Sequence, residues 1–446
     1  MDNKIARPVL IIWYTLIILF SLSFFKLPQI QYLNNYHNID ILGDIKETPK
    51  APLPGIPKTV AVPIALQPTT KGLAHAVDII DSSMITDYSA DSAASMQVFL
   101  NKMADLKHKK GKVRIAYFGD SFIEADYITG ELRSRLQQMY GGNGVGFVPV
   151  QSIVADSYES IHFNKNNSWV DYNFHNNPKK LALGLTGHVF YSNGDAWCEY
   201  GASNNKFANM YLYTGKTIDT NTVITVDEDG IKNNITVNNN AYINQTILNN
   251  AGAIKKFKLS CASKNLPVYG ISIEDSTGVY IDNYGFRGNT GLLGLQVPTE
   301  VIDGFKKYFN YDLIIIHYGL NAVVHNDTNF EWFDRGITKL VQKIKSSYPG
   351  VPVLLVSTSD IAYNESGQYI TDPAVPLLVQ SQNETAKKNN VAFWNLYYSM
   401  GGANTIANWV DGDTVLAYKD YMHVNEKGAD RIAGIFFTKL QKAQKN

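Results

Sequence analysis

Apolar and polar positions along the chain form blocks whose period changes in a regular way. Short apolar runs such as DLIIIHYG, from Asp312, are typical of strands that are covered on both faces. Between such runs, apolar residues recur at helical spacing, as in EWFDRGITKLVQKIKSSY. Strands that alternate with helices predict an α/β fold with a doubly wound (flavodoxin-like) parallel sheet, whose ligands bind beyond the carboxyl ends of the strands.

The other predicted elements follow the same alternation. The sequence predicts a helix in SAASMQVFLNKMADLKHKKG, a strand in KVRIAYFG, a helix in IEADYITGELRSRLQQMYGG, a strand in VPVLLVSTS, a helix in PAVPLLVQSQNETAKKNN, a strand in VAFWNLY and a last amphipathic helix in NEKGADRIAGIFFTKLQKAQ. We assign these elements to two parts of one α/β domain, residues 73–154 and 276–446.

The intervening residues 155–275 break this rhythm. The stretch NTVITVDEDGIKNNITV has short β-branched runs separated by Asp, Gly and Asn, and it shows little helical periodicity. This pattern predicts an inserted all-β domain. Both cysteines of the chain, Cys198 and Cys261, fall inside it. In an exported protein they are compatible with a disulfide, and equally with two buried thiols.

The N-terminal region differs in composition from the rest. Lys4 and Arg7 precede the charge-free run VLIIWYTLIILFSLSFF at residues 9–25. Its length is at the short end of a membrane-spanning helix but exceeds a usual signal-peptide core. We expect an uncleaved anchor, with residues 1–8 in the cytoplasm and the rest exported to the periplasmic side. A cleaved signal peptide leads to the same compartment. The proline-rich residues 26–72 predict an extended tether.

Composition narrows the classes of function. Forty basic and 40 acidic side chains give a formal net charge of zero, so the charge balance does not indicate nucleic acid as a partner. The sequence has no HExxH motif, no CxxC pair and no phosphate-binding glycine loop. We therefore expect neither a metal nor a cofactor.

The candidate reactive residue is Ser121, in the stretch RIAYFGDSFIEAD. The strand before it leads to the carboxyl edge of the sheet, and the N-terminus of the following helix offers N–H groups to a developing oxyanion. A serine in this place needs a base. In YKDYMHVNEKG, Asp420 precedes His423 by three residues. This spacing lets the carboxylate hold Nδ1–H and leaves Nε2 free to face the serine.

Two further segments offer donors for an oxyanion. Gly288 lies in the glycine-rich loop DNYGFRGNTG, where a missing side chain lets a backbone N–H approach a ligand. Asn321 follows the buried strand in IIIHYGLNAV and has a side-chain amide. Read singly, Gly288 is a turn glycine and Asn321 a helix cap. His317, still inside that strand, is interpreted as a core residue and not as a second base.

Together these residues resemble the ordered sequence blocks of the SGNH (GDSL-type) hydrolases. In chain order, the matching residues are Ser121, Gly288, Asn321, Asp420 and His423. The resemblance covers roughly residues 95–155 and 280–440. The stretch GDSFIEADYITGELRSRLQQMYGGNGVGFVPV is similar to the first block of peptidoglycan O-acetylesterases. Those enzymes also carry a carbohydrate-binding-like β-sandwich between the first and second blocks, where this chain has its β-rich insertion.

The resemblance implies a role for each residue. Ser121 is the nucleophile, His423 the general base, and Asp420 the group that orients the imidazole. The oxyanion is bound by the N–H groups of Ser121 and Gly288 and by the amide of Asn321. Asp120, the middle residue of the Gly-Asp-Ser motif, is expected to have a structural role.

The implied function is a serine esterase that removes O-acetyl groups from cell-wall glycan. A peptidoglycan O-acetylesterase acting on the acetyl group at O-6 of muramic acid is preferred, with the acetylated glycan and the membrane as partners. Two alternatives stay open: an O-acetyltransferase with the same triad, and a non-catalytic glycan-binding scaffold. Trp197, Tyr200 and Tyr211 in the insertion are compatible with a sugar platform, but core packing is the preferred interpretation.

Overall fold

The computed structural model describes residues 84–445, except residues 153, 155–160, 203–208, 220 and 250–253. The predicted N-terminal segments at 1–8, 9–25 and 26–72 lie outside the described residues. Within the described part, no helix combines the length and the apolar character that a membrane crossing requires.

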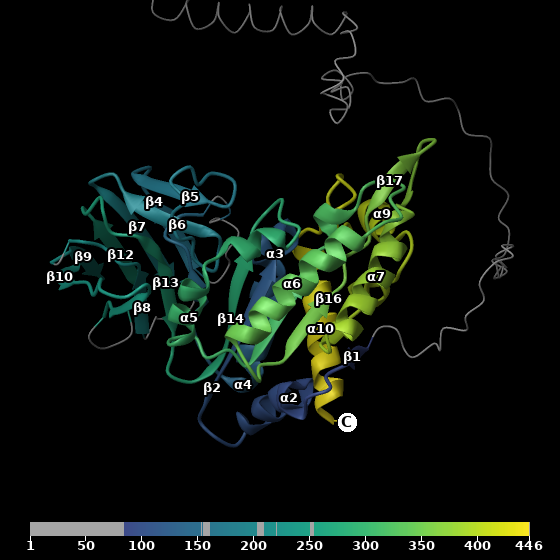
Figure 1. The fold of residues 1–446 in the computed structure, drawn as a ribbon, viewed down its shortest axis with the longest axis horizontal. Coiled ribbons are helices and arrows are strands. Elements are labelled where there is room, and N and C mark those ends of the chain that lie inside the picture. The colour runs from purple at the N-terminus through teal and green to yellow at the C-terminus, as the bar shows by residue number, and fades with distance from the viewer. Residues whose placement is uncertain are drawn as a thin grey trace, which may run out of the picture. The chain divides into compact units, whose positions relative to one another are not determined.

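Six strands form the central sheet, and five of them are parallel (Figure 1). In spatial order they are β1 (Ile85–Asp87), β19 (Ala392–Trp394), β16 (Val353–Val356), β15 (Leu313–His317), β2 (Lys112–Gly119) and β14 (Gly278–Gly285). β1 is antiparallel to its neighbour β19. Every residue of β15 is buried, which explains its continuous apolar run. The predicted α/β fold with a parallel sheet is confirmed.

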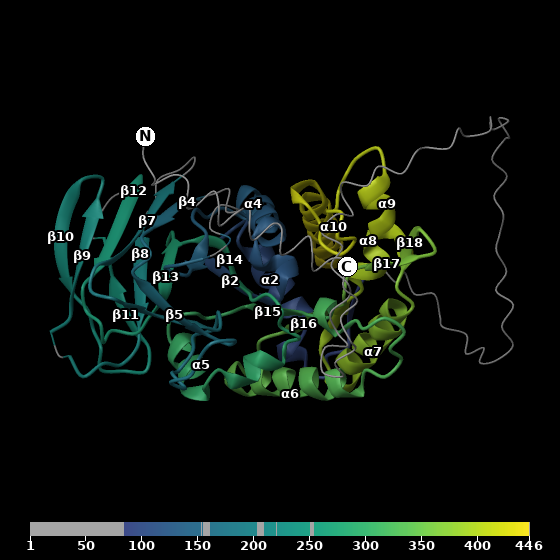
Figure 2. The same cartoon turned by 90° about the horizontal axis from the view of Figure 1, so that it is seen from above.

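Helices cover both faces of this sheet (Figure 2). One face carries α2 (Met96–Asp105), α4 (Tyr127–Tyr140) and α10 (Glu426–Lys445), and the other carries α5 (Thr299–Lys306), α6 (Glu331–Ser347) and α7 (Ala374–Lys388). In α6, Phe333, Ile337 and Leu340 recur at helical spacing and are buried. Such a stripe determines which side of a helix packs on the sheet. Each face therefore has a hydrophobic core of its own.

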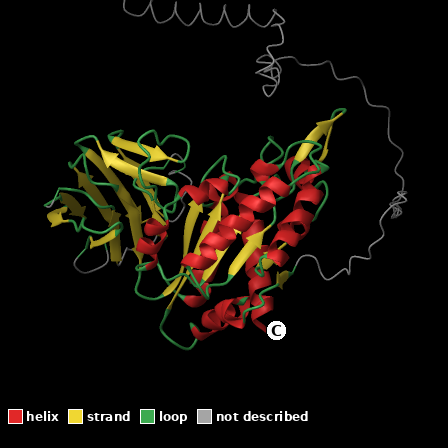
Figure 3. Cartoon of the chain, in the orientation of Figure 1, coloured by secondary structure: helices red, strands yellow, loops and turns green. Residues whose placement is uncertain are grey.

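Two antiparallel sheets form the inserted domain (Figure 3). The first contains β10 (Ile231–Thr236), β9 (Val223–Glu228), β12 (Lys256–Cys261), β7 (Ala196–Ala202) and β4 (Ile161–Lys165). The second contains β11 (Asn244–Ile247), β8 (Asn209–Thr214), β13 (Val268–Glu274), β6 (His188–Ser192) and β5 (Trp169–Asn173), and β3 (Gly146–Val148) pairs with β13. Side chains such as Leu212, Leu259 and Ile271 belong to one buried core of this domain. The predicted β-rich insertion is confirmed.

Both cysteines lie in the core of the inserted domain as free thiols. Cys198 on β7 and Cys261 on β12 are buried and do not form a disulfide. Of the two alternatives left by the sequence, the structure has the pair of buried thiols. Burial raises the pKa of the Cys261 thiol to about 11, so it is protonated at neutral pH.

The aromatic side chains singled out in the insertion differ in exposure. Tyr200 is fully buried, and its hydroxyl donates a hydrogen bond to the carbonyl of Pro149 at 2.8 Å. Trp197 is half-buried, with the ammonium of Lys258 4.0 Å from its ring centre, and Tyr211 is half-buried as well. For Tyr200, core packing is therefore the correct interpretation.

The two connections between the domains pass each other at glycines. One connection leads from α4 into β3, and the other leads from β13 into β14. A Cβ atom on Gly278 would collide with the backbone of Gly142, and one on Gly144 would collide with the carbonyl of Ile273. Gly278 and Gly144 also have φ of 101°, which favours glycine. The glycine-rich sequence GGNGVGF thus allows the close backbone packing between the domains.

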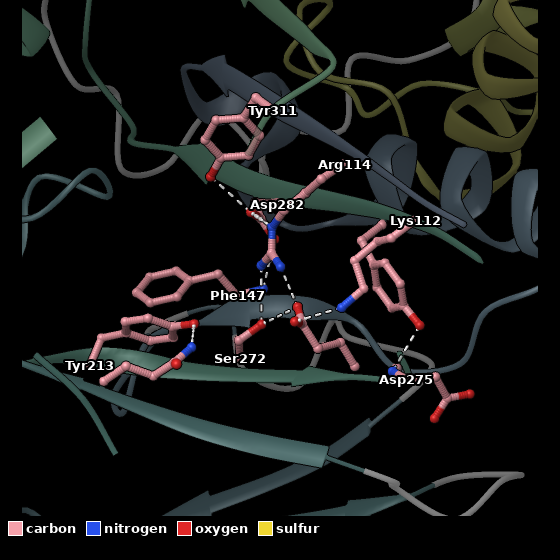
Figure 4. Close-up of polar contacts among 12 residues, drawn as sticks. Lys112, Arg114, Phe147, Tyr213, Ser272, Asp275, Asp282 and Tyr311 are labelled. Atoms are coloured by element: carbon pink, nitrogen blue, oxygen red, sulfur yellow. Dashed lines mark hydrogen bonds and ion pairs between the residues drawn. The ribbon is translucent and has the colours of Figure 1, made fainter. Parts of the chain in front are cut away.

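A buried charge network joins the strands of both domains (Figure 4). Arg114 on β2 donates to the carboxylate of Asp282 on β14 at 2.6 and 2.8 Å, and it also pairs with Glu274 on β13. The carboxylate of Asp282 further accepts from the hydroxyl of Tyr311 and from the N–H of Phe147 on β3, both at 2.8 Å. Burial lowers the pKa of Arg114, but the charges of Asp282 and Glu274 outweigh it, so the pKa is raised.

The structure corrects the predicted helix after the Gly-Asp-Ser motif. Instead of one helix there are two, α3 (Ser121–Glu124) and α4, with Asp126 between them at φ of 62°. The carboxylate of Asp126 pairs with Arg133 and accepts from the hydroxyl of Thr129 at 2.6 Å. Side-chain bonds therefore hold a left-handed residue at a place where periodicity alone predicts a continuous helix.

Several elements were not predicted. They include the edge strands β1 and β14, the helices α5, α8 (Leu396–Met400) and α9 (Thr405–Asp411), and a hairpin of β17 (Ala362–Glu365) and β18 (Gln368–Thr371). In the hairpin turn, Ser366 and Gly367 have φ of 53° and 92°. Positive φ at both central residues suits the twist of a two-residue hairpin.

Candidate active site

Ser121 lies at the carboxyl edge of the central sheet. Strand β2 runs parallel between β14 and β15 and ends at Gly119. A Cβ atom on Gly119 would lie 2.9 Å from the carbonyl oxygen of His317, so the exit from the strand requires glycine. Asp120 then caps α3, because its Oδ1 accepts a hydrogen bond from the N–H of Phe122 at 3.0 Å. Ser121 is the first residue of α3 and is half-buried.

His423 reaches Ser121 from the loop before α10. Its Nε2 is 2.9 Å from Ser121 Oγ, and its Nδ1 is 2.7 Å from Asp420 Oδ2. Asp420 Oδ1 accepts from the N–H groups of Met422 and His423 at 3.1 and 3.0 Å, which fixes the carboxylate. With Nδ1–H donated to Asp420, Nε2 faces the serine hydroxyl as an acceptor. The structure thus brings the three predicted residues into one hydrogen-bond chain.

The hydrogen-bond chain of Ser121, His423 and Asp420 is open to solvent at its His423 and Asp420 end. The side chains of His423 and Asp420 are 31% and 48% exposed. A substrate that approaches from solvent can therefore meet Ser121 Oγ without a rearrangement of the core.

The two other candidate donors lie in loops that follow β14 and β15. Gly288 is exposed, with φ of 70°, and Asn321 is exposed in a short 3-10 helix after β15. The amide of Asn321 donates to the carbonyl of Asn289 at 3.3 Å and also lies close enough to Asp120 to lower its pKa. Asn321 therefore contacts both the residue after Gly288 and the residue before Ser121.

The carboxyl group of Asp120 is buried beside the serine. Its Oδ1 caps α3, whereas its Oδ2 has no hydrogen-bond partner among the described residues. Burial raises the pKa of Asp120 to about 7, although the Phe122 N–H, the charge of His423 and the Asn321 amide each lower it. The hydrogen bond that Asp120 Oδ1 accepts is a helix cap.

His317 is a core residue. It is 3% exposed, and its Nδ1 lies 3.1 Å from the hydroxyl of Tyr117. Burial lowers the pKa of His317 to about 3, so its imidazole is neutral at neutral pH. This agrees with the interpretation of His317 as a packed residue that takes no proton from the serine.

Two residues next to Gly288 were missed by sequence reasoning. Arg287 Nε is 2.6 Å from Glu124 Oε2 at the end of α3, and His175 Nε2 is 3.3 Å from the carbonyl oxygen of Arg287. The partners are 163 and 112 positions apart. No local spacing links residues so distant, so a single sequence carries no signal for these contacts.

Residues 265–431 match the model of the GDSL-like Lipase/Acylhydrolase family. This segment of the chain is therefore similar to GDSL-type (SGNH) acylhydrolases. The matched segment includes Gly288, Asn321, Asp420 and His423, whereas Ser121 precedes it. Among curated protein sequences, no match was found.

The fold is shared with a solved structure described as "Peptidoglycan O-acetylesterase in action, 5 min". The TM-score is 0.68 at 21% identity, and the match covers 81% of this chain and 99% of that chain. A family two carbohydrate esterase from Cellvibrio japonicus matches with a TM-score of 0.26 at 10% identity, over 64% of this chain and 98% of that one. An acetyl xylan esterase, AlAXEase, matches with 0.27 at 18% identity, over 36% and 79%. Only the first match is high enough to support an argument, and that argument concerns the fold.

Proposed function

We propose that this protein is a serine esterase that removes O-acetyl groups from cell-wall glycan, acting on acetyl at O-6 of muramic acid in peptidoglycan. The observation that carries the proposal is the hydrogen-bond chain from Ser121 through His423 to Asp420, with steps of 2.9 and 2.7 Å. The similarity to GDSL-type acylhydrolases and the fold shared with a peptidoglycan O-acetylesterase support it.

In the proposed first half-reaction, Ser121 Oγ attacks the carbonyl carbon of the acetyl ester. His423 Nε2 takes the hydroxyl proton as the new C–O bond forms, and Asp420 stabilises the resulting imidazolium. The tetrahedral intermediate then collapses, the C–O bond to the sugar breaks, and the sugar oxygen leaves with the proton from His423. The products are a free sugar hydroxyl and an acetyl group on Ser121.

In the second half-reaction, water replaces the sugar. His423 takes a proton from water, which attacks the acetyl carbonyl, and the proton returns to Ser121 Oγ as acetate leaves. The exposure of His423 and Asp420 supports water as the acceptor, because solvent reaches this edge of the site. An acetyltransferase with the same triad would need to exclude water at this step.

The proposed oxyanion hole consists of the N–H groups of Ser121 and Gly288 and the amide of Asn321. Removing one such donor costs about 10²–10³-fold in kcat in a serine hydrolase. Asn321 donates to the Asn289 carbonyl at 3.3 Å in the free protein, a weak bond that it can exchange for the oxyanion.

The test is acetate release from O-acetylated peptidoglycan by the full chain in mild detergent, beside a folded Ser121→Ala variant. We expect release by the parent and none by the variant. Equal release by both would overturn the proposal. Hydrolysis of a small acetyl ester without acetate release from peptidoglycan would keep the esterase and reject the wall substrate. Transfer of acetyl to added sugar in preference to water would favour the acetyltransferase.

We further propose that residues 9–25 anchor the enzyme in the membrane and that residues 26–72 tether it on the periplasmic side. The charge-free apolar run and the basic residues Lys4 and Arg7 before it support this orientation. Cell fractionation with protease treatment tests it. A full-length chain in the membrane fraction, digested only when protease reaches the periplasm, is the expected result. A shorter soluble chain would indicate a cleaved signal peptide.

A further inference from the structure

The inserted β domain surrounds the ring of Phe286, two residues before Gly288. Three rings, those of Phe174, His175 and His188, each have their centre 5.0 Å from that of Phe286. His188 lies on β6, and the other two follow the end of β5. Phe286 is 5% exposed. One residue of the loop after β14 is therefore enclosed by aromatic groups that the inserted domain supplies.

The same loop is fixed on its other side by the α/β domain. The N–H of Phe286 donates to the carbonyl of Gly119 at 2.9 Å, two residues before Ser121. Arg287 Nε pairs with Glu124 Oε2 at 2.6 Å, on the short helix that starts with Ser121. The loop thus lies between the serine-bearing turn and the inserted domain, with a contact to each.

One contact of the inserted domain acts on the peptide unit that carries the proposed oxyanion donor. His175 Nε2 is 3.3 Å from the carbonyl oxygen of Arg287. That carbonyl and the N–H of Gly288 belong to the same peptide unit, which is planar and trans. The two groups point in opposite directions in such a unit. A donor that holds the carbonyl therefore directs the N–H away from the inserted domain.

Gly288 needs such a support because its own conformation is weakly restrained. It is exposed, has φ of 70° and has no side chain to pack. Glycine populates many backbone conformations, so a peptide flip costs little unless a neighbour opposes it. The neighbour is itself held, because the main-chain N–H of His175 donates to Asn173 Oδ1 at 3.0 Å and its ring lies with its centre 5.0 Å from that of Phe286.

We propose that His175 of the inserted domain is a positioning residue that orients the Gly288 N–H for the developing oxyanion. The inserted domain is then part of the catalytic unit, in addition to any role in glycan binding. A hydrogen bond to a carbonyl also polarises its peptide unit and strengthens the N–H on the other side as a donor. This inference rests on the proposed esterase function.

The test uses a small soluble ester, p-nitrophenyl acetate, which does not need a glycan-binding surface. We expect His175→Ala and His175→Asn to lower kcat by about 10-fold with KM within about twofold, because a misaligned donor is lost in the transition state. His175→Gln, whose amide reaches farther than that of Asn, is expected to keep kcat within about threefold of the parent. His162→Ala, at an exposed histidine on β4 of the same domain, is the matched control and is expected to leave kcat unchanged.

The outcomes separate the possible roles of His175. An unchanged kcat on the small ester in folded His175→Ala and His175→Asn would overturn the proposal, even if activity on peptidoglycan fell. An equal loss in the Asn and Gln variants would overturn it as well, because reach would then not matter. If the parent itself fails to hydrolyse the ester in a Ser121-dependent way, the esterase function is what fails. Unfolding in urea confirms that each variant is folded.

Discussion

The two ends of strand β2 use polar groups in opposite ways. Near its start, Arg114 is 3% exposed and is surrounded by partners on β13 and β14. Just beyond its end, Ser121 joins a hydrogen-bond chain whose other members, His423 and Asp420, are 31% and 48% exposed. One strand therefore carries a closed charge network at one end and an open reactive group at the other.

The difference follows from solvation. A charge buried away from water is strongly destabilising unless it is paired, so the groups around Arg114 depend on one another for stability. Groups that water reaches can be replaced at little cost in stability. Replacing Ser121, His423 or Asp420 is therefore expected to lower activity and not stability. The first end therefore joins the two domains, and the second holds the residues of the proposed reaction.

Replacing Asp420 gives the largest expected effect at the open end. We expect Asp420→Asn to lower kcat for acetyl ester hydrolysis by about 10³–10⁴-fold, because an amide no longer holds the required His423 tautomer. The free energy of unfolding should change by less than about 1 kcal/mol, since both side chains are solvated. The rate of acetate release measures kcat, and urea unfolding measures the free energy of unfolding. A loss of activity below tenfold would contradict the role given to Asp420.

Replacing Arg114 gives the largest expected effect at the closed end. Arg114→Met leaves the carboxylates of Asp282 and Glu274 buried without their cation, and we expect a loss of about 3–5 kcal/mol in unfolding free energy. The kcat per folded molecule should stay within about twofold, because Arg114 touches no reacting group.

The matched control for that variant is Lys102→Met. Lys102 forms an ion pair with Asp312 but is 50% exposed, so its loss should cost less than about 1 kcal/mol. Equal losses of unfolding free energy in the two variants would contradict the distinction between the closed end and the open end of β2. A large fall in kcat for folded Arg114→Met would do the same.

The residues of the open end could be predicted because each belongs to a local pattern. An apolar run leads into Ser121, and three positions separate Asp420 from His423. Gly288 and Asn321 were identified from a glycine-rich loop and from the end of a buried strand. Parallel strands bring their carboxyl ends to one edge, which leads to the expectation that Ser121 and Asn321 lie there. Gly288, Asp420 and His423 were connected to them by the order of the SGNH sequence blocks that the chain resembles.

The closed end and the contacts of the inserted domain could not be predicted in this way. Arg114 and Asp282 are 168 positions apart, and His175 and Arg287 are 112 apart. Such pairs can be identified only when the pairing and register of the strands are known. The pattern of a single sequence did not give that pairing. The break at Asp126 was missed because Arg133 fits an ordinary position in a continuous helix. Its ion pair with Asp126 is visible only in the folded structure.

Asp120 has a buried carboxyl group at the open end, and it predicts an effect of pH. Burial raises its pKa in the folded protein to about 7 from the ordinary value of 3.8. Between these values the folded chain holds a proton that the unfolded chain releases, so its contribution to stability is complete below 3.8 and is lost as pH rises toward 7. Asp120→Asn lacks this loss but keeps an oxygen that can cap α3.

We therefore expect the stability of Asp120→Asn, relative to the parent, to rise by about 1.4 kcal/mol per pH unit across this window. Above pH 7 the difference should be constant. Urea unfolding of both proteins from pH 4 to 8 measures it. Parallel stability curves would show that the carboxyl group is ionised throughout this range. The Asp120 carboxyl group would then be more solvated than its burial in the structure indicates.

Glu274, at the closed end, predicts a smaller effect of opposite sign. Burial alone raises its pKa, but the charges of Arg114 and Lys112 outweigh it, so the pKa is lowered from the ordinary value of 4.5. Its stabilising contribution is then present above pH 4.5 and is lost as pH falls through the lower folded value. Glu274→Gln should be less stable than the parent at pH 6, and the gap should narrow on acidification below pH 4.5. Glu331→Gln, whose side chain is 76% exposed, is the control and should cost less than about 1 kcal/mol at pH 6. A gap that stays constant for Glu274→Gln would mean that its carboxylate gains nothing from Arg114, and the closed end would then owe its stability to packing and not to charge.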